Sequence, residues 1–182
     1  MKKIKLYEKI NYKGLDWFVT KVYDDKLTLM LADRLPDEII LKVFDSSMLD
    51  RDLDVKFDDE TIDWYDSYVK QKLHNEFLKI LNIDRKDLCV MITNYAEEEL
   101  VTDLVRIPTL KECRELPKNI ICRNSIWSFW LMNKGVNKTL FNTGVFAFSR
   151  DTGGASGTYS FRVVRPVITV LADRLDRGVE DD

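Results

Sequence analysis

Histidine and cysteine are scarce in this chain, with one histidine and three cysteines among 182 residues. A single histidine cannot build a multi-histidine metal site. The three cysteines are too widely spaced for a Cys-x-x-Cys metal pair, and their odd number argues against a disulfide framework. We therefore predict no metal site, and reduced core thiols at Cys89, Cys113 and Cys122.

Long apolar runs and several familiar motifs are also missing. No stretch approaches the roughly 20 apolar residues of a membrane-spanning helix. The charged N-terminus lacks the apolar core of a signal peptide. The sequence contains no P-loop, no GxGxxG, no His-Glu-x-x-His and no recognisable Ser-His-Asp order. These absences predict a cytoplasmic protein with no membrane contact and no small-molecule cofactor.

The only histidine, His74, directly follows Leu73 on the apolar stripe of a predicted helix. Successive helical residues are turned by about 100°, so His74 lies off the buried seam. It can supply one member of an acid–base pair with a carboxylate or a lysine. Catalytic residues are otherwise unknown from the sequence, and His74 is the only candidate.

Charge is distributed unevenly, although the net charge is only −3. Residues 1–23 carry six lysines against two carboxylates, a net charge of +4, whereas residues 24–66 carry five basic and fourteen acidic side chains, a net charge of −9. A basic front end on an acidic chain can mark nucleic-acid contact, but lysines also protect exposed sheet edges from aggregation. The candidate RNA-binding residues are Lys2, Lys3, Lys5, Lys9, Lys13 and Lys21.

The acidic segment Asp33–Thr61 admits two interpretations. Its clusters Asp50–Asp54 and Asp58–Glu60 lack the glycine and the spacing of a calcium loop. A solvated loop is the preferred interpretation, because charge runs usually remain in water. The alternative is an acidic surface that mimics nucleic acid.

Turn residues and alternating side chains predict a β-meander over residues 1–32. Asn11–Gly14 and Asp24–Lys26 carry turn chemistry, and Gly14 can take a positive φ. The segments between and after these turns, Leu15–Tyr23 and Leu27–Leu31, have strand patterns.

Apolar spacing predicts one main amphipathic helix over Ile62–Asn82, capped by Asp66 or Ser67. Its buried stripe consists of Val69, Leu73, Phe77, Ile80 and Leu81. A second, short helix is predicted after Thr109, whose spacing to Glu112 is that of a capping box.

The C-terminal half carries strand patterns separated by connectors. Strands are predicted at Leu88–Thr93, Ser125–Met132, Val145–Ser149 and Tyr159–Leu171. Non-regular segments are predicted at Asn119–Ser125 and Asp151–Gly157, and in a frayed tail from Asp173. The last strand is expected in the core, with Pro166 marking an edge, a bulge or a bend and Arg165 paired with buried acceptors.

Together these elements predict a single α+β domain. It consists of an N-terminal β-hairpin or meander, one main amphipathic helix plus a short helix, and a mixed, mostly antiparallel sheet. Residues 1–32 form the meander, residues 33–172 the α+β core, and residues 173–182 a charged tail.

Four segments carry a resemblance to a known family. They are Gly14-x-x-Trp17-x-Val19, Trp64-x-Asp66-Ser67, the aromatic segment Trp127–Leu131, and Val164–Val167. Their order resembles a bacterial and phage domain family of unassigned function, whose members carry G-x-x-W-x-V, W-x-D-S, W-W-L and V-R-P motifs. The resemblance spans residues 10–171 and implies a C-type-lectin-like fold, in which a late Arg-Pro strand closes a small sheet.

Length and sequence also resemble the streptococcal type II-A anti-CRISPR proteins that act on guide RNA. This resemblance implies that the partner is a type II CRISPR nuclease with its guide RNA, inside a bacterial host cell, and that the guide is truncated when the nuclease is present. It leaves open whether this chain or the nuclease complex cuts the RNA. Two alternatives are a non-enzymatic anti-CRISPR whose acidic segment blocks a nucleic-acid channel, and a lectin-like ligand-binding phage domain.

Overall fold

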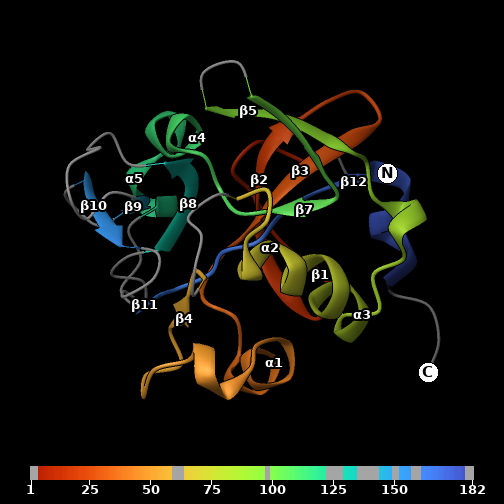
Figure 1. Cartoon of the computed structure of the whole chain (residues 1–182). Helices are drawn as coiled ribbons and strands as arrows, with labels where there is room; N and C mark the ends of the chain where they lie inside the picture. The colour runs from red at the N-terminus through yellow and green to blue at the C-terminus, as the bar shows by residue number, and fades with distance from the viewer. Residues whose placement is uncertain are drawn as a thin grey trace.

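The computed structural model describes residues 4–58, 64–96, 99–121, 129–134, 144–148, 152–156 and 161–178. Its largest element is an antiparallel sheet of five strands in the order β1-β2-β3-β12-β7 (Figure 1). These strands are β1 (Lys9–Tyr12), β2 (Leu15–Val22), β3 (Lys26–Leu31), β12 (Val167–Leu171) and β7 (Val105–Arg106). Helices pack around the sheet, so the predicted α+β class is confirmed.

The other strands form three smaller antiparallel sheets. They are β4 (Val55–Lys56) with β11 (Phe161–Arg162), β5 (Met91–Ala96) with β6 (Glu99–Asp103), and β8 (Phe129–Lys134) with β9 (Gly144–Phe148) and β10 (Thr152–Ser156). The α-helices are α1 (Asp37–Val43), α2 (Tyr68–Lys72), α3 (Leu78–Ile80), α4 (Leu110–Glu115) and α5 (Lys118–Ile121). Short 3₁₀ turns lie at Ser46–Met48, Arg85–Asp87 and Ala172–Gly178.

The predicted meander is confirmed in its two hairpins. The turn between β1 and β2 consists of Lys13 and Gly14, whose φ angles are 53° and 76°. Two positive φ values in a two-residue turn are the type I′ geometry, whose twist matches that of the paired strands. β2 then pairs with β3, with a bulge between Val19 and Lys21.

The C-terminal strand lies in the centre of the sheet, between β3 and β7. The prediction of one continuous strand over Tyr159–Leu171 is wrong, because β11 and β12 are separate and β11 pairs with β4. Pro166 lies at the break, since proline has no N–H for a ladder. Its carbonyl instead accepts a hydrogen bond of 2.9 Å from the Leu31 N–H. The predicted core position is confirmed for β12.

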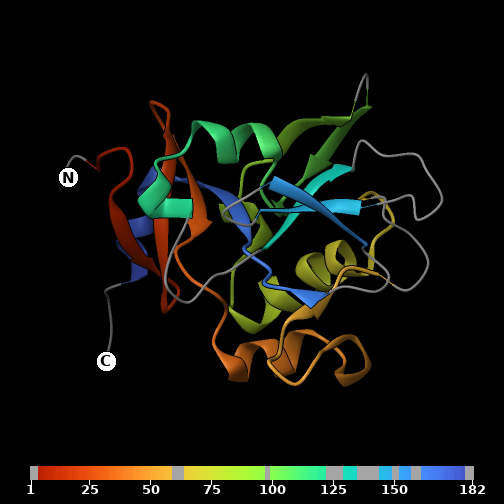
Figure 2. The same ribbon diagram turned by 90° about the vertical axis from the view of Figure 1, so that its left-hand side faces the viewer.

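The central sheet buries both of its faces. Trp17 and Val19 point to one face, in a cluster shared with Leu73 of the main helix. Phe18 and Met30 point to the opposite face, in a second cluster that includes residues of α4, α5 and β8. The helices α4 and α1 accordingly lie at opposite ends of the molecule (Figure 2).

The main helix begins later than predicted. α2 starts at Tyr68, after Ser67 caps it by accepting a hydrogen bond from the Lys70 N–H. Residues 64–66 form a turn, and residues 61–63 lie outside the described part of the chain. α2 continues through a π-helical turn, Leu73–Phe77, into α3. The predicted buried stripe is confirmed at Val69, Leu73 and Phe77, which are fully buried.

The prediction of a solvated loop is wrong for most of Asp33–Thr61, although the cluster Asp50–Asp54 lies outside any helix or strand, as predicted, and residues 59–61 lie outside the described part of the chain. This segment contains α1, a 3₁₀ turn and β4. The apolar residues Ile40, Val43 and Phe44 are buried against the core beneath the acidic surface. The helix is short, so a pattern of only three buried apolar residues is difficult to recognise in a sequence rich in charged residues. The start signal was present, however, because Asp37 and Glu38 occupy the first turn directly after a proline.

Four further boundaries differ from prediction. The predicted loop at 151–157 contains β10, whose pairing with β9 needs only backbone groups. The predicted connector at 119–125 begins inside α5, and the predicted strand Leu88–Thr93 is shifted to β5. The predicted frayed tail is a 3₁₀ turn as far as Gly178, because Leu175 packs against the core. The remaining tail residues, 179–182, lie outside the described part.

Within the described residues, no helix is both long and apolar enough to cross a membrane.

Candidate functional site

His74 and Lys70 stand one helical turn apart and meet the same carboxylate. His74 lies in the π-helical turn, four residues after Lys70 of α2, and helical residues with this spacing share a face. Asp103, the last residue of β6 in the two-stranded sheet of β5 and β6, faces them. π-Helical turns frequently occur at functional sites, so this cluster is the candidate site.

The Asp103 carboxylate is surrounded by three donors. Its Oδ1 lies 3.1 Å from the Lys70 Nζ and 3.3 Å from the His74 Nε2. Its Oδ2 accepts a hydrogen bond of 2.8 Å from the indole N–H of Trp64. The Asp103 side chain is fully buried, whereas the side chains of Lys70 and His74 are 16% and 21% exposed. The cluster therefore connects a buried anion to the surface.

Asp103 remains ionised despite its burial. Burial alone raises the pKa of a carboxyl group. Contacts with His74, Trp64 and Lys70 outweigh that effect and hold the pKa of Asp103 below its ordinary value. The group beside His74 is thus a carboxylate at neutral pH, which can orient the imidazole.

The His74 ring is close to Asp103 but not aligned with it. The 3.3 Å separation is within ion-pair range, yet Nε2 makes no well-directed hydrogen bond, and it is buried. Catalytic hydrogen bonds are often long in the absence of substrate and tighten when substrate binds. Because Nε2 faces Asp103, Nδ1 is the ring nitrogen left to exchange a proton with a ligand.

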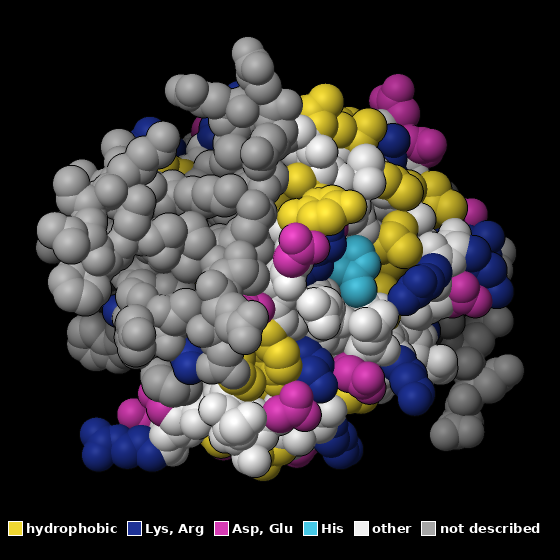
Figure 3. Space-filling model, viewed as in Figure 1, with side chains coloured by type: hydrophobic (Ala, Val, Ile, Leu, Met, Phe, Trp, Pro, Cys, Tyr) yellow, Lys and Arg dark blue, Asp and Glu magenta, His cyan; other side chains and the backbone are white. Residues whose placement is uncertain are grey.

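An exposed aromatic ring borders the cluster. Tyr65 is 63% exposed, and the Lys70 ammonium lies 4.7 Å from its ring centroid. Arg85 donates a hydrogen bond of 3.0 Å to the carbonyl oxygen of His74. The cyan imidazole in Figure 3 is His74, the only histidine in the chain, and it reaches the surface among apolar, basic and acidic side chains.

None of the candidate RNA-binding lysines in the described part of the chain contacts this site. Lys2 and Lys3 lie outside the described residues. Lys9 pairs with Asp16 at 2.7 Å, and Lys21 lies 3.4 Å from Glu112 of α4. The remaining two, Lys5 and Lys13, are exposed.

The central sheet separates Lys9 and Lys21 from the histidine. Lys9 is paired with Phe18, whose side chain points to the face covered by α4. Lys21 reaches towards α4 on that same face. His74 belongs to the helix on the other face, where its neighbour Leu73 is buried. The hairpin continues the five-stranded sheet, with β1 as its edge strand and β2 between β1 and β3.

Sequence reasoning found His74 but missed its partners. The i, i+4 spacing of Lys70 and His74 was a readable signal. Asp103 had no such signal, because it is 29 positions beyond His74 and its approach depends on how β6 packs against the helix. Trp64 opens the motif Trp64-x-Asp66-Ser67 and Tyr65 occupies its unspecified position, but their individual roles depend on the turn that precedes α2.

The acidic residues and the thiols of the described regions offer no metal site. No three histidine, cysteine, aspartate or glutamate side chains gather there closely enough to hold a metal ion. Cys89 and Cys113 are free thiols, as predicted, and Cys122 lies outside the described residues. Burial raises the pKa of Cys113 to about 12, so this thiol is a poor nucleophile.

No protein-family model, curated protein sequence or solved structure matches this chain. The family membership and the C-type-lectin-like relation implied by the four motifs therefore stay predictions.

Proposed function

We propose that this protein cleaves RNA by acid–base chemistry at the cluster of Tyr65, Lys70, His74 and Asp103. The observation that supports the proposal is that the only histidine and a lysine contact the same buried carboxylate, while both of their side chains reach the surface. An imidazole held by a carboxylate is a common general base near neutral pH. The exposed Tyr65 ring adds a surface on which a base can stack.

The proposed reaction uses the 2′-hydroxyl of the RNA as its nucleophile. Nδ1 of His74 takes the proton of this hydroxyl, and the 2′-oxygen attacks the adjacent phosphorus. The Lys70 ammonium stabilises the added negative charge on the phosphoryl oxygens. The bond from phosphorus to the 5′-oxygen breaks, and the departing oxygen takes a proton from water. The products are a 2′,3′-cyclic phosphate and a 5′-hydroxyl end.

We further propose that the substrate is the guide RNA of a type II CRISPR nuclease. This part of the proposal is supported by the resemblance to anti-CRISPR proteins and by no contact within the fold. The proposed setting is the cytoplasm of the bacterial host.

The decisive experiment incubates guide RNA with the nuclease, with this protein, or with both, in the presence and absence of EDTA. Shortened RNA in the mixture of both proteins is the expected result. EDTA is expected to leave this cleavage unchanged, because the groups proposed to carry out the reaction are side chains of this protein and not a metal ion. End-group analysis is expected to find a 2′,3′-cyclic phosphate.

Two variants assign the chemistry to His74. His74→Gln keeps an N–H donor towards Asp103 but removes the ring nitrogen that would take the proton, and is expected to slow cleavage by about 10²–10⁴-fold. Asn75→Ala changes the exposed neighbouring residue and serves as the control. Cleavage by His74→Gln at the wild-type rate contradicts the acid–base assignment and leaves the nuclease complex as the agent of cleavage.

The same assay separates the alternatives. Intact guide RNA together with lost DNA cleavage contradicts RNA cutting and favours a non-enzymatic block by the acidic segment. In that case, reversing the exposed charges at Asp37 and Glu38 of α1 is the next measurement. No effect on either nucleic acid contradicts both anti-CRISPR proposals and favours a ligand-binding domain.

A further inference from the structure

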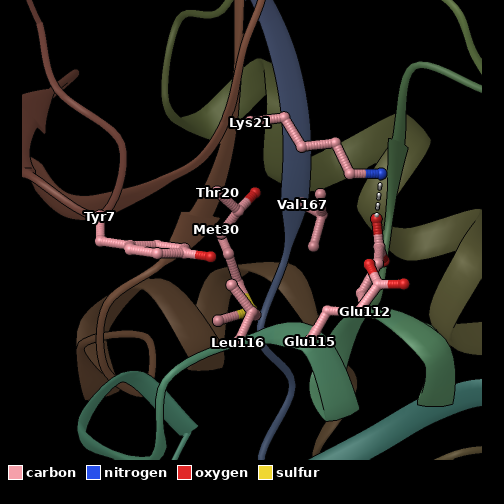
Figure 4. A pocket seen from close by; sticks show the side chains of 8 residues that line it. All are labelled: Tyr7, Thr20, Lys21, Met30, Glu112, Glu115, Leu116 and Val167. Carbon is pink, nitrogen blue, oxygen red and sulfur yellow. Dashed lines mark hydrogen bonds and ion pairs between the residues drawn. The ribbon is translucent and has the colours of Figure 1, made fainter.

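A small hollow lies on the face of the central sheet opposite His74. It has a volume of about 110 Å³ and is partly open to solvent. A single ordered water needs only about 10–15 Å³ on this measure, so the hollow can hold a small organic group. Its apolar floor consists of Met30 of β3, Val167 of β12 and Leu116 after α4 (Figure 4).

The polar groups around this floor are mainly hydrogen-bond acceptors. The Thr20 hydroxyl donates its proton to the Thr28 carbonyl oxygen at 3.2 Å, so it faces a ligand as an acceptor. The Glu115 carboxylate is exposed, with no hydrogen bond or ion pair among the described residues, and a carboxylate only accepts. The Tyr7 hydroxyl, which points into the hollow in Figure 4, can donate or accept.

The two remaining charged side chains that line the hollow, Lys21 and Glu112, lie close to each other, and Glu112 also binds other groups of the fold. The Lys21 ammonium lies 3.4 Å from the Glu112 carboxylate, as the dashed line in Figure 4 marks. Glu112 also accepts hydrogen bonds from the Arg106 guanidinium and from the Thr109 N–H. This carboxylate is therefore neutralised within the fold, whereas the carboxylate of Glu115 is not.

Tyr7 is held in an uncommon backbone conformation beside the hollow. Its φ is 66°, in the left-handed region that bulky residues rarely adopt. A hydrogen bond of 2.7 Å from the Tyr7 N–H to the Val19 carbonyl oxygen maintains this conformation. Strained residues cluster at ligand-binding positions, where the surrounding structure supports them.

We propose that this hollow binds a small primary amine with an apolar body, in its ammonium form. The apolar body contacts Met30, Val167 and Leu116. The ammonium group donates hydrogen bonds to the Glu115 carboxylate and to the hydroxyl oxygens of Thr20 and Tyr7. An acceptor-rich rim with one unneutralised carboxylate favours a positively charged donor over a neutral alcohol or a carboxylate ligand.

The test uses three probes of equal chain length: n-pentylamine, 1-pentanol and pentanoate. Binding to the full chain is measured by calorimetry at neutral pH and mapped by NMR chemical-shift changes. Saturable binding of n-pentylamine is expected, with at least tenfold weaker binding of 1-pentanol and none of pentanoate. Absence of saturable amine binding, or equal affinity for the amine and the alcohol, overturns the proposal.

Matched variants locate the site. Glu115→Gln keeps the shape of the side chain and is expected to weaken n-pentylamine binding about tenfold or more, the range of a charged hydrogen bond. Tyr7→Phe gives a smaller loss. Glu38→Gln, an exposed substitution on α1 at the other end of the molecule, is the control and leaves the affinity unchanged. Wild-type affinity in a folded Glu115→Gln protein also overturns the proposal.

This inference is independent of the proposed RNA cleavage. The hollow and the His74 cluster lie on opposite faces of the central sheet and share no residue. Amine binding in a protein that leaves RNA intact therefore supports the hollow alone.

Discussion

The Arg165 side chain donates two hydrogen bonds to the carbonyl oxygen of Leu31, from Nε at 3.0 Å and from Nη2 at 2.8 Å. The same guanidinium reaches the Ile120 carbonyl of α5 at 3.1 Å, and it lies 5.0 Å from the centroid of the Phe129 ring. Arg165 is fully buried. It therefore joins β3, α5 and β8 from the segment before β12.

Arg165→Ala is expected to lower the free energy of unfolding by more than about 3 kcal/mol, because each buried acceptor left without a donor costs roughly 1–3 kcal/mol. Arg165→Lys is expected to lose most of this stability as well, since an ammonium lacks the planar fork that reaches both Leu31 and Ile120. Chemical denaturation measures both variants. Arg51→Ala, at a side chain that is 92% exposed, is the control. An Arg165→Ala protein as stable as wild type contradicts the core role.

Acid is expected to destabilise the protein through Glu112. Burial raises the pKa of this carboxyl, but Arg106, the Thr109 N–H and Lys21 outweigh burial and lower the pKa from 4.5 to about 2. A depressed carboxyl pKa stabilises the folded state at pH values above the unfolded-state pKa. This contribution, about 3 kcal/mol for a shift of that size, is lost progressively as the pH falls from 4.5 towards 2.

Urea denaturation at several pH values, with wild type and Glu112→Gln, measures this effect. Glu112→Gln is expected to be less stable at neutral pH, because the buried Arg106 loses its anion. Its stability should also fall less steeply in acid. Parallel curves for the two proteins contradict the assignment to Glu112. Asp103, whose pKa is also lowered, contributes to both curves equally.

Charge reversal of Lys5 and Lys13 tests the predicted RNA contact of the hairpin. Both lysines are exposed, so the double Glu variant is expected to change stability by no more than about 0.5 kcal/mol per site. If they hold phosphates, RNA binding weakens, and the log–log salt slope becomes shallower by about 0.7 to 0.9 for each lost contact. Lys42→Glu on α1 is the control. An unchanged slope would assign these lysines to edge protection.

Thiol labelling tests the burial of Cys113. Its pKa of about 12 and its buried position predict no reaction with maleimide in the folded protein at neutral pH. Labelling of Cys113 is expected only after denaturation, and mass spectrometry of peptides locates the label. Rapid labelling of Cys113 in the native protein contradicts this prediction. Replacement of all three cysteines by alanine is expected to preserve activity in any variant that folds.

Local sequence determined the features that depend on neighbouring residues. The capping box is present, with the Thr109 side chain accepting from the Glu112 N–H and the Glu112 carboxylate accepting from the Thr109 N–H. The turn at Lys13 and Gly14 and the buried stripe through Leu73 are equally local. Each depends on spacings of a few residues, which the sequence shows directly.

Tertiary structure alone decided which distant residues meet. Glu112 is a helix cap by its sequence, but only packing makes it the partner of Arg106 and Lys21. His74 is an isolated histidine by its sequence, and it acquires a carboxylate only because Asp103 ends the neighbouring strand β6. The periodicity of helices and strands predicts which side chains are buried. Periodicity does not predict which buried side chains from separate elements come into contact, because those contacts depend on the packing of the whole core.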